Sequence, residues 1–334
     1  MDISVVLCTY NGAHYLEKQL GSLSSQTRLP SELIICDDGS SDRTIEILKA
    51  FQAKAPFPVQ IRVNPVRLGV TKNFEQAISL CSRELIALCD QDDCWLPEKL
   101  ELVDEYFQQF PEVGAVFSDG IVVGADLIPL GYTLWQHVGF TVAEQLMMEK
   151  KAGMEVLLKH VAVTGATLVI KATLRLRVLP IPQEWMHDAW IALIASASEI
   201  LRGMPAPLIQ YRHHGANVVG APRRSLLERL RETFRIDREF YYGSEIVRYR
   251  LARDRLESLS GLIREDALAL VDEKLRHLEA RAQLSDSRIG RIGPILKEFS
   301  ASGYRRNSFG WQVAVKDFLL PSRKPSIEVQ EDRI

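Results

Sequence analysis

Along residues 1–120, short continuous apolar runs alternate with segments whose apolar residues recur every three or four positions. The continuous runs predict buried strands, and the periodic segments predict amphipathic helices. Strands that alternate with helices favour a mostly parallel sheet with helices on both faces. We expect strands at 3–8, 32–36, 59–63, 85–89 and 113–117, and helices at 13–23, 44–51, 71–81 and 97–110.

The pattern changes twice further along the chain. Between 120 and 160 it blurs, which suggests loops and a lid or acceptor-facing region, before strands at 163–171 and 208–211 and a helix at 187–199. After Pro222, residues 223–283 have the pattern of charged amphipathic helix, and 311–320 form one more short amphipathic stretch. These changes predict an α/β domain over 1–221 and a helical region over 222–334.

Composition places the chain among globular proteins, with 46% hydrophobic and 25% charged residues in a length of 334. The net charge of −2 conceals an asymmetry. Residues 222–334 carry 23 Lys+Arg and 18 Asp+Glu, a balance of +5, which leaves 18 and 25, or −7, in the residues before them. The acidic front and the basic back therefore need separate explanations.

Targeting signals and cysteines favour the cytoplasm. No apolar run approaches the ~20 residues that span a bilayer, and the N-terminus lacks the basic region of a signal peptide. The five cysteines form no CxxC pair, so we expect free thiols and no zinc site.

Polar residues follow three of the predicted strands where each strand ends. Thr9, Tyr10 and Asn11 follow the first, Asp37 and Asp38 end the second, and residues 90–93 (DQDD) end the fourth. Each alone is typical of a cap for the next helix, but parallel strands bring their carboxyl ends to one edge, where ligands bind. We therefore expect a ligand site at this edge.

The acidic cluster Asp90, Asp92 and Asp93 suggests a cation. Adjacent carboxylates repel one another unless a positive charge compensates them. Magnesium and manganese prefer such oxygen ligands and share substrate phosphates with them. A solvated acidic turn is the alternative, which the flanking apolar strand and Trp95 disfavour. Neither a P-loop lysine motif nor a GxGxxG after the first strand is present, so classical dinucleotide binding and NTPase activity are disfavoured.

Four ordered motifs resemble those of the family 2 glycosyltransferases with a GT-A fold. They are VVLCTYNG at 5–12, DDGSSD at 37–42, RLGVTKN at 67–73 and DQDDCW at 90–95. The later segments HDAW at 187–190 and YRHHGANVVG at 211–220 resemble the bacterial rhamnosyltransferase branch, with His213 where that branch usually has Gln. The resemblance covers residues 1–220.

This resemblance implies roles for particular residues. Thr9, Tyr10 and Asp38 would hold the nucleoside, and Asp90 and Asp92 would face the ribose and diphosphate. The metal would lie on Asp92 or Asp93, and Asp188 stands where the family has its general base. From the same motifs we expect further donor contacts from Asn11, Arg67, Lys72 and Gln91, and cationic contacts to the diphosphate from Arg212 or His214.

Two of these assignments have simpler alternatives. Asp188 opens an apolar helix, where a carboxylate also serves as a cap and favours the helix dipole. His213 and His214 are equally consistent with surface histidines in a turn, or with a flap that closes over the diphosphate.

The sequence does not decide what the basic residues after 222 bind. Arg223, Arg229, Arg231, Arg235 and Arg238 punctuate a segment with an apolar stripe, a pattern of helices on anionic bilayers. Interspersed glutamates fit equally well an ordinary packed helix or an oligomer contact. Nucleic-acid binding is not expected, because the front domain is acidic and no reader motif occurs.

Together these observations predict an inverting, metal-dependent glycosyltransferase that uses magnesium or manganese. The favoured donor is dTDP-rhamnose, with a UDP-sugar as the alternative. The acceptor would be a glycan or a lipid-linked sugar of cell-surface polysaccharide synthesis, such as O-antigen, at the cytoplasmic face of the membrane. Two other functions stay open: a nucleotidyltransferase, which the missing glycine-rich loop disfavours, and a non-catalytic nucleotide-sugar or glycan-binding module.

Overall fold

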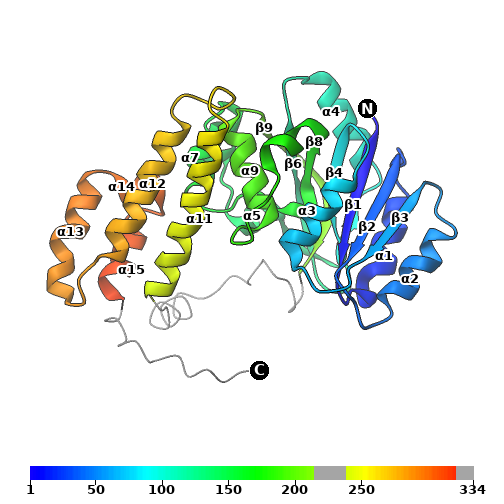
Figure 1. The fold of residues 1–334 in the computed structure, drawn as a ribbon, viewed down its shortest axis with the longest axis horizontal. Coiled ribbons are helices and arrows are strands. Elements are labelled where there is room, and N and C mark those ends of the chain that lie inside the picture. Colours follow the sequence, from blue (N-terminus) through cyan, green and yellow to red (C-terminus); the bar gives the residue numbers. More distant parts are fainter. Residues whose placement is uncertain (214–237, 321–334) are drawn as a thin grey trace. The chain divides into compact units, whose positions relative to one another are not determined.

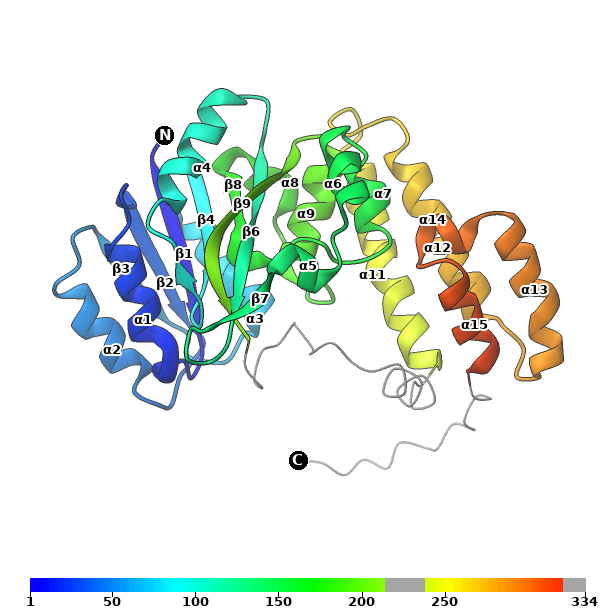
Figure 2. The same cartoon turned by 180° about the vertical axis from the view of Figure 1, so that it is seen from behind.

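The computed structural model describes residues 1–213 and 238–320 (Figures 1 and 2). The chain divides into two compact units: Met1–Ala221 with Leu259–Glu265, and Pro222–Ser258 with Asp266–Ile334. His214 and the predicted basic stretch at 223–237 lie outside the described residues.

The first unit contains a nine-stranded sheet with the order β3-β2-β1-β4-β8-β6-β9-β5, and β7 pairs with β6. Its first four strands are parallel neighbours and match the predicted runs. They are β1 (Ile3–Thr9), β2 (Glu32–Asp37), β3 (Val59–Val63) and β4 (Leu85–Asp90). Every residue of β1 is buried, as expected for a central strand covered on both faces.

Helices cover both faces of this parallel half because the chain reverses its direction across the sheet. The connections from β1 to β2 and from β2 to β3 step one way, and the connection from β3 to β4 steps back across β1. Right-handed crossovers then put α1 (Ala13–Ser24) and α2 (Thr44–Gln52) on one face and α3 (Val70–Leu80) on the other (Figures 1 and 2). The point of reversal, between β1 and β4, is where open sheets bind ligands.

The other half of the sheet is mixed. β8 (Leu168–Lys171) is antiparallel to both β4 and β6 (Ala115–Val123), whereas β9 (Leu201–Arg212) runs parallel to β6. A two-residue strand, β5 (Cys94–Trp95), pairs with β9 and brings the acidic turn after β4 next to Arg212. The helices α4 (Lys99–Gln109) and α9 (His187–Ala197) agree with the predicted segments. All eleven residues of α9 are buried, which explains its apolar composition.

The prediction of loops between 120 and 160 was wrong. This segment forms β7 (Pro129–Thr133), α5 (Leu134–Val138), α6 (Val142–Glu149) and α7 (Gly153–Leu157). Helices of five to eight residues are too short to produce a visible period. A sequence signal for two of them exists in the capping boxes that start at Thr133 and Thr141. Short one-turn helices, η1 (Gly165–Thr167), η2 (Ala172–Leu174) and α8 (Arg175–Val178), flank β8.

The described part of the second unit is helical, as the charged pattern predicts. Its helices are α11 (Arg238–Ser258), α12 (Ala267–Ala282), α13 (Arg288–Ser300), α14 (Gly303–Asn307) and α15 (Trp311–Leu319). In the part of the chain that the structure describes, no helix combines the length and the apolar character needed to cross a membrane.

Candidate active site

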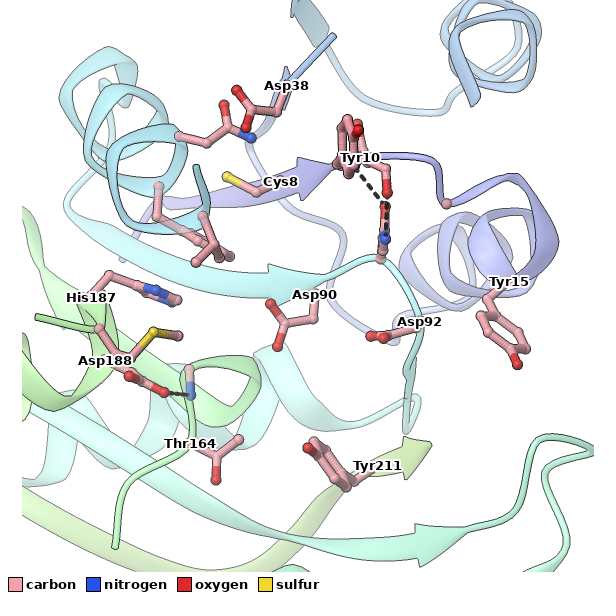
Figure 3. Close-up of a pocket in the computed structure, with 18 of the residues that line it drawn as sticks. Cys8, Tyr10, Tyr15, Asp38, Asp90, Asp92, Thr164, His187, Asp188 and Tyr211 are labelled. Carbon is pink, nitrogen blue, oxygen red and sulfur yellow. Dashed lines mark hydrogen bonds between the residues drawn. The ribbon is translucent and has the colours of Figure 1, made fainter. Parts of the chain in front are cut away.

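A pocket of about 490 Å³ opens at the carboxyl edge of the parallel strands (Figure 3). Its volume lies within the ~300–1,000 Å³ that is typical of ligand sites. Residues from β1, α3, β4 and the start of α9 contribute to its walls, together with Asp38 directly after β2. The pocket brings together these residues predicted from the sequence: Thr9, Tyr10, Asn11, Asp38, Arg67, Asp90, Gln91, Asp92 and Asp188.

The end of β1 is locked to the turn after β2. The Thr9 hydroxyl donates a buried hydrogen bond of 2.7 Å to Asp37 Oδ2. Asn11 adopts a left-handed backbone conformation with φ of 48°, which Asn tolerates, and its Oδ1 accepts the backbone N–H of Ser41 at 2.9 Å. Asp37 is therefore a buried support of the turn, and Asp38 is the aspartate that lines the pocket.

Gln91 holds the backbone of Tyr10 by two hydrogen bonds. Its Oε1 accepts the Tyr10 N–H at 2.9 Å, and its Nε2 donates to the Tyr10 carbonyl at 3.1 Å (Figure 3). Gly12 leaves room for this carboxamide, since a Cβ at Gly12 would stand 2.1 Å from Gln91 Oε1. The Arg67 guanidinium lies 3.9 Å from the centre of the Tyr10 ring. Tyr10 thus presents a positioned aromatic ring at the pocket wall.

Asp38 fixes the loop between β3 and α3. Its Oδ1 accepts hydrogen bonds from the Leu68 N–H at 2.7 Å and from Asn64 Nδ2 at 3.0 Å, and its Oδ2 accepts the Gly69 N–H at 2.9 Å. The carboxylate is almost fully buried. This aspartate therefore positions the loop that carries Arg67, in addition to facing the pocket.

Three carboxylates, those of Asp90, Asp92 and Asp188, concentrate negative charge in the pocket (Figure 3). Burial, followed by the charges of Asp92 and Asp188, raises the pKa of Asp90 well above its usual range. Burial lowers the pKa of Lys99 in α4 to about 7. Lys99 donates to the Ala166 carbonyl at 2.8 Å and lies over the Trp95 ring. A bound cation would lower the pKa of Asp90 again, because it would favour the charged form of the carboxylate.

Asp188 occupies the first turn of α9, where Met186 precedes the helix as the cap residue. Its Oδ2 accepts the N–H of Gly165 at 2.9 Å, and its Oδ1 accepts the N–H of Ala189 at 2.7 Å. These two backbone donors fix the carboxylate in one orientation and leave lone pairs on both oxygens. Asp188 therefore stabilises the start of α9, which is the simpler of the two roles that the sequence allows. Its carboxylate also faces the pocket.

Of the predicted residues that the structure describes, three do not line this pocket, and each has a structural task. Lys72 donates to Glu75 at 2.8 Å and to the Ile181 carbonyl at 2.7 Å. Asp93 is buried and accepts the Arg212 N–H at 2.8 Å. Arg212 is buried too, and its Nε donates to the carbonyl of Asp92 at 2.6 Å. Arg212 therefore ties the acidic turn to β9.

His187 is a pocket residue that reasoning from the sequence did not select. Its ring stacks on Phe74 with a centroid separation of 3.9 Å, and both of its nitrogens are buried without a hydrogen-bond partner in the described residues. Burial lowers the pKa of His187, so the ring is neutral at pH 7. The sequence signal that could have identified His187 as a site residue is its position directly before Asp188. Other lining residues without a sequence signal are Tyr15, Leu134, Thr164 and Gly165, whereas Tyr211, which also lines the pocket, opens the segment 211–220 that the sequence singled out.

The sheet, its point of reversal and the pocket at its edge define an α/β domain of the GT-A type. A solved structure of TarS from S. aureus in complex with UDP-GlcNAc has the same fold, with a TM-score of 0.58 and 17% sequence identity. The match covers 95% of this chain and 80% of that chain. This confirms the predicted fold.

Residues 4–156 match the model of glycosyl transferase family 2, so this region is a family 2 glycosyltransferase domain, as its motifs predict. An uncharacterized glycosyltransferase of Nostoc sp. is 32% identical over 126 residues, 38% of this chain and 39% of the relative. The abequosyltransferase RfbV of Salmonella typhimurium is 29% identical over 132 residues, 39% of both chains. The glucosyltransferase WfgD of Escherichia coli is 30% identical over 101 residues, 30% of this chain and 38% of the relative. The chain thus spans about two fifths of the length of these relatives.

Proposed function

We propose that this protein transfers a sugar, with inversion, from a nucleotide-sugar donor to a hydroxyl group of a glycan or lipid-linked acceptor in cell-surface polysaccharide synthesis. The observation that carries the proposal is the oriented carboxylate of Asp188, which faces the same pocket as the acidic end of β4. The named relatives support the acceptor class. One is an abequosyltransferase, and another is named for transfer of glucose from UDP-Glc to a GlcNAc-diphosphoundecaprenol.

The favoured donor is dTDP-rhamnose, and the support for this choice is the resemblance of the sequence at 187–190 and 211–220 to the rhamnosyltransferase branch. TarS in its complex with UDP-GlcNAc supports the wider class of nucleotide sugars and keeps UDP-sugars as the alternative. The nucleoside would lie against the Tyr10 ring, at the wall that Asp38 and Gln91 hold in place. An aromatic ring at this place offers a surface on which a nucleobase can stack.

Asp188 would act as the general base. An acceptor hydroxyl has a pKa far above 7, so it must lose its proton as it attacks the anomeric carbon. The backbone N–H groups of Gly165 and Ala189 hold the Asp188 carboxylate for this transfer. Attack from the side opposite the diphosphate inverts the anomeric centre through an oxocarbenium-like state.

The pocket residues fit a divalent cation that is shared with the substrate. No group of three or more metal-ligating side chains occurs in residues 1–213 and 238–320. However, magnesium commonly takes one or two protein carboxylates and completes its shell with phosphate oxygens and water. Burial, and after it the charges of Asp92 and Asp188, raises the pKa of Asp90, and a bound cation would compensate these neighbouring carboxylates. Asp92, with Asp90 behind it, would hold the ion, which would offset the charge that develops on the leaving diphosphate. The carboxylate of Asp93 faces the backbone of Arg212 instead.

The variant Asp188→Asn tests the base assignment, and Asp119→Asn is its matched control. Asp119 is as buried as Asp188 and also accepts two backbone N–H groups, those of Gly120 and Trp135, but it does not line the pocket. We expect Asp188→Asn to lower the transfer rate by roughly 10²–10⁴-fold with the donor Kd unchanged, and Asp119→Asn to keep its transfer rate. Normal turnover by Asp188→Asn, or an equal loss in both variants, would show that the assignment is wrong.

A panel of nucleotide-sugar donors tests which donor the protein uses and whether it needs a metal ion. Release of dTDP from dTDP-rhamnose and of UDP from UDP-sugars would be measured with and without a chelator. We expect dTDP-rhamnose to be hydrolysed fastest and the chelator to abolish hydrolysis. Faster release of UDP would exclude the rhamnose assignment, and activity in the chelator would exclude the metal.

A further inference from the structure

The helices α13 and α15 of the second unit expose their apolar side chains and bury charged ones. On α13, Ile289, Ile292, Leu296 and Phe299 follow one another at intervals of three and four residues, so they lie along one face. Ile289 is 82% exposed and Leu296 is 62% exposed. The one buried residue of α13 is a charged one, Arg291. A surface helix ordinarily shows the opposite arrangement.

The inward face of α13 is polar because Arg291 caps the end of α15. Its guanidinium donates to the backbone carbonyls of Asp317 at 3.2 Å and Phe318 at 3.1 Å, and its Nε donates to the Ser285 carbonyl at 2.6 Å. These hydrogen bonds fix the rotation of α13. The apolar stripe of α13 is therefore held outward and cannot turn into the unit without breaking them.

The helix α15 repeats this arrangement. Asp317 is fully buried and accepts hydrogen bonds from Tyr242 and Tyr304 and an ion pair from Arg281. On the exposed side, Trp311, Val315 and Phe318 are again spaced by four and three residues, and Phe309 precedes them. Trp311 is 65% exposed. α13 and α15 contact each other within this unit (Figure 1).

The charges around these stripes are mainly positive. Between residues 286 and 320, the exposed charged side chains are four cations, Arg288, Lys297, Arg305 and Arg306, and one anion, Asp286. A partner for this surface must therefore accept large aromatic and aliphatic side chains together with Arg and Lys. An anionic lipid bilayer has both properties, since it buries apolar side chains below headgroups that attract cations.

We propose that α13 and α15 dock this protein onto an anionic membrane surface, with their apolar stripes inserted at the headgroup boundary. A second copy of the chain fits less well, because an isologous contact would place the same cations against one another. The expectation of a membrane contact from the basic residues at 223–238 concerned a different segment. This docking surface is independent of glycosyl transfer and stands even if the proposed chemistry fails.

The test is sedimentation of the full chain with vesicles of phosphatidylcholine alone, or of phosphatidylcholine mixed with phosphatidylglycerol. We expect binding to the mixed vesicles that weakens as salt is added, because exposed cations are screened. Leu296→Glu should weaken this binding by about tenfold or more, since it removes an inserted side chain and adds a repelled charge. Leu176→Glu, an exposed leucine of α8 in the other unit, is the matched control and should bind like the wild type.

Three results would overturn the proposal. They are absence of binding to the mixed vesicles, equal binding by Leu296→Glu and Leu176→Glu, and a dimer in sedimentation equilibrium that Leu296→Glu dissociates. The last result would assign the surface to a second copy. Circular dichroism of both variants checks that the helices persist, as expected for substitutions of exposed side chains.

Discussion

Asp38 offers a sharp test of how the pocket is built, because its buried carboxylate accepts three hydrogen bonds. The donors are the backbone N–H groups of Leu68 and Gly69 and the side chain of Asn64, at 2.7–3.0 Å. The side chain is 3% exposed. These bonds hold the loop that carries Arg67 against Tyr10. The loop geometry, and with it the wall of the nucleoside site, should depend on the carboxylate.

The variant Asp38→Asn keeps the shape of the side chain and replaces one acceptor oxygen by an NH₂ group. The remaining oxygen can still accept from Leu68 and Asn64, which both bond Oδ1 at present. The new amide would then face the Gly69 N–H, donor against donor. A hydrogen bond to a charged group contributes about 1.5–3 kcal/mol. We expect the free energy of unfolding to fall by about that amount.

Urea denaturation followed by circular dichroism measures this loss, and calorimetric titration with dTDP measures its effect on nucleotide binding. Asp126→Asn is the control, because Asp126 is exposed and makes one long hydrogen bond, to the Ile128 N–H at 3.2 Å. Its unfolding free energy should change by less than about 0.5 kcal/mol. If Asp38→Asn lost dTDP affinity at unchanged stability, the carboxylate would act as a ligand contact alone and the reasoning about the loop would be refuted.

Three further predictions concern other parts of the molecule. Gly12→Ala should displace the Gln91 carboxamide from Tyr10 and lower the unfolding free energy by about 1–3 kcal/mol. Gly21→Ala, which meets no atom within 4 Å inside α1, should raise it by about 0.5–1 kcal/mol in the same assay, and equal effects would contradict the argument. Asp317→Asn should cost about 3–5 kcal/mol in denaturant unfolding, because it leaves Arg281 buried without a counter-charge, and a loss under 1 kcal/mol would argue against that pairing. Asp92→Asn should raise the Mn²⁺ concentration for half-maximal donor hydrolysis by at least about tenfold, whereas an unchanged metal dependence would exclude Asp92 as a ligand.

Much of the first unit could be predicted from local pattern. Continuous apolar runs marked three of the four parallel strands, β1, β2 and β4, and the polar residues after them marked the edge where the pocket opens. This succeeds because a strand buried on both faces requires an unbroken apolar run, and parallel strands necessarily share a carboxyl edge. The prediction for residues 120–160 failed because five-residue helices are too short to show a hydrophobic period. Their positions are fixed by helix caps and tertiary contacts instead.

Neighbouring acids could not be separated by sequence. Asp37 supports a turn whereas Asp38 faces the pocket, and Asp92 lines the pocket whereas Asp93 binds the backbone of Arg212. Consecutive side chains in a turn point in different directions, and the partner of Asp93 lies 119 residues away. The sequence alone therefore determined that acids gather at this edge, and the tertiary structure decided which of them face a ligand.

The helical second unit shows the same division. The sequence alone predicted charged amphipathic helix over 223–283 and a short amphipathic stretch at 311–320, and the described residues there form helices at 238–258, 267–282 and 311–319. Only the tertiary structure decided that α13 and α15 turn Arg291 and Asp317 inward and their apolar stripes outward. The physical reason is that a helical pattern fixes which residues share a face, whereas the direction of that face depends on partners distant in the chain, such as Tyr242 and Arg281.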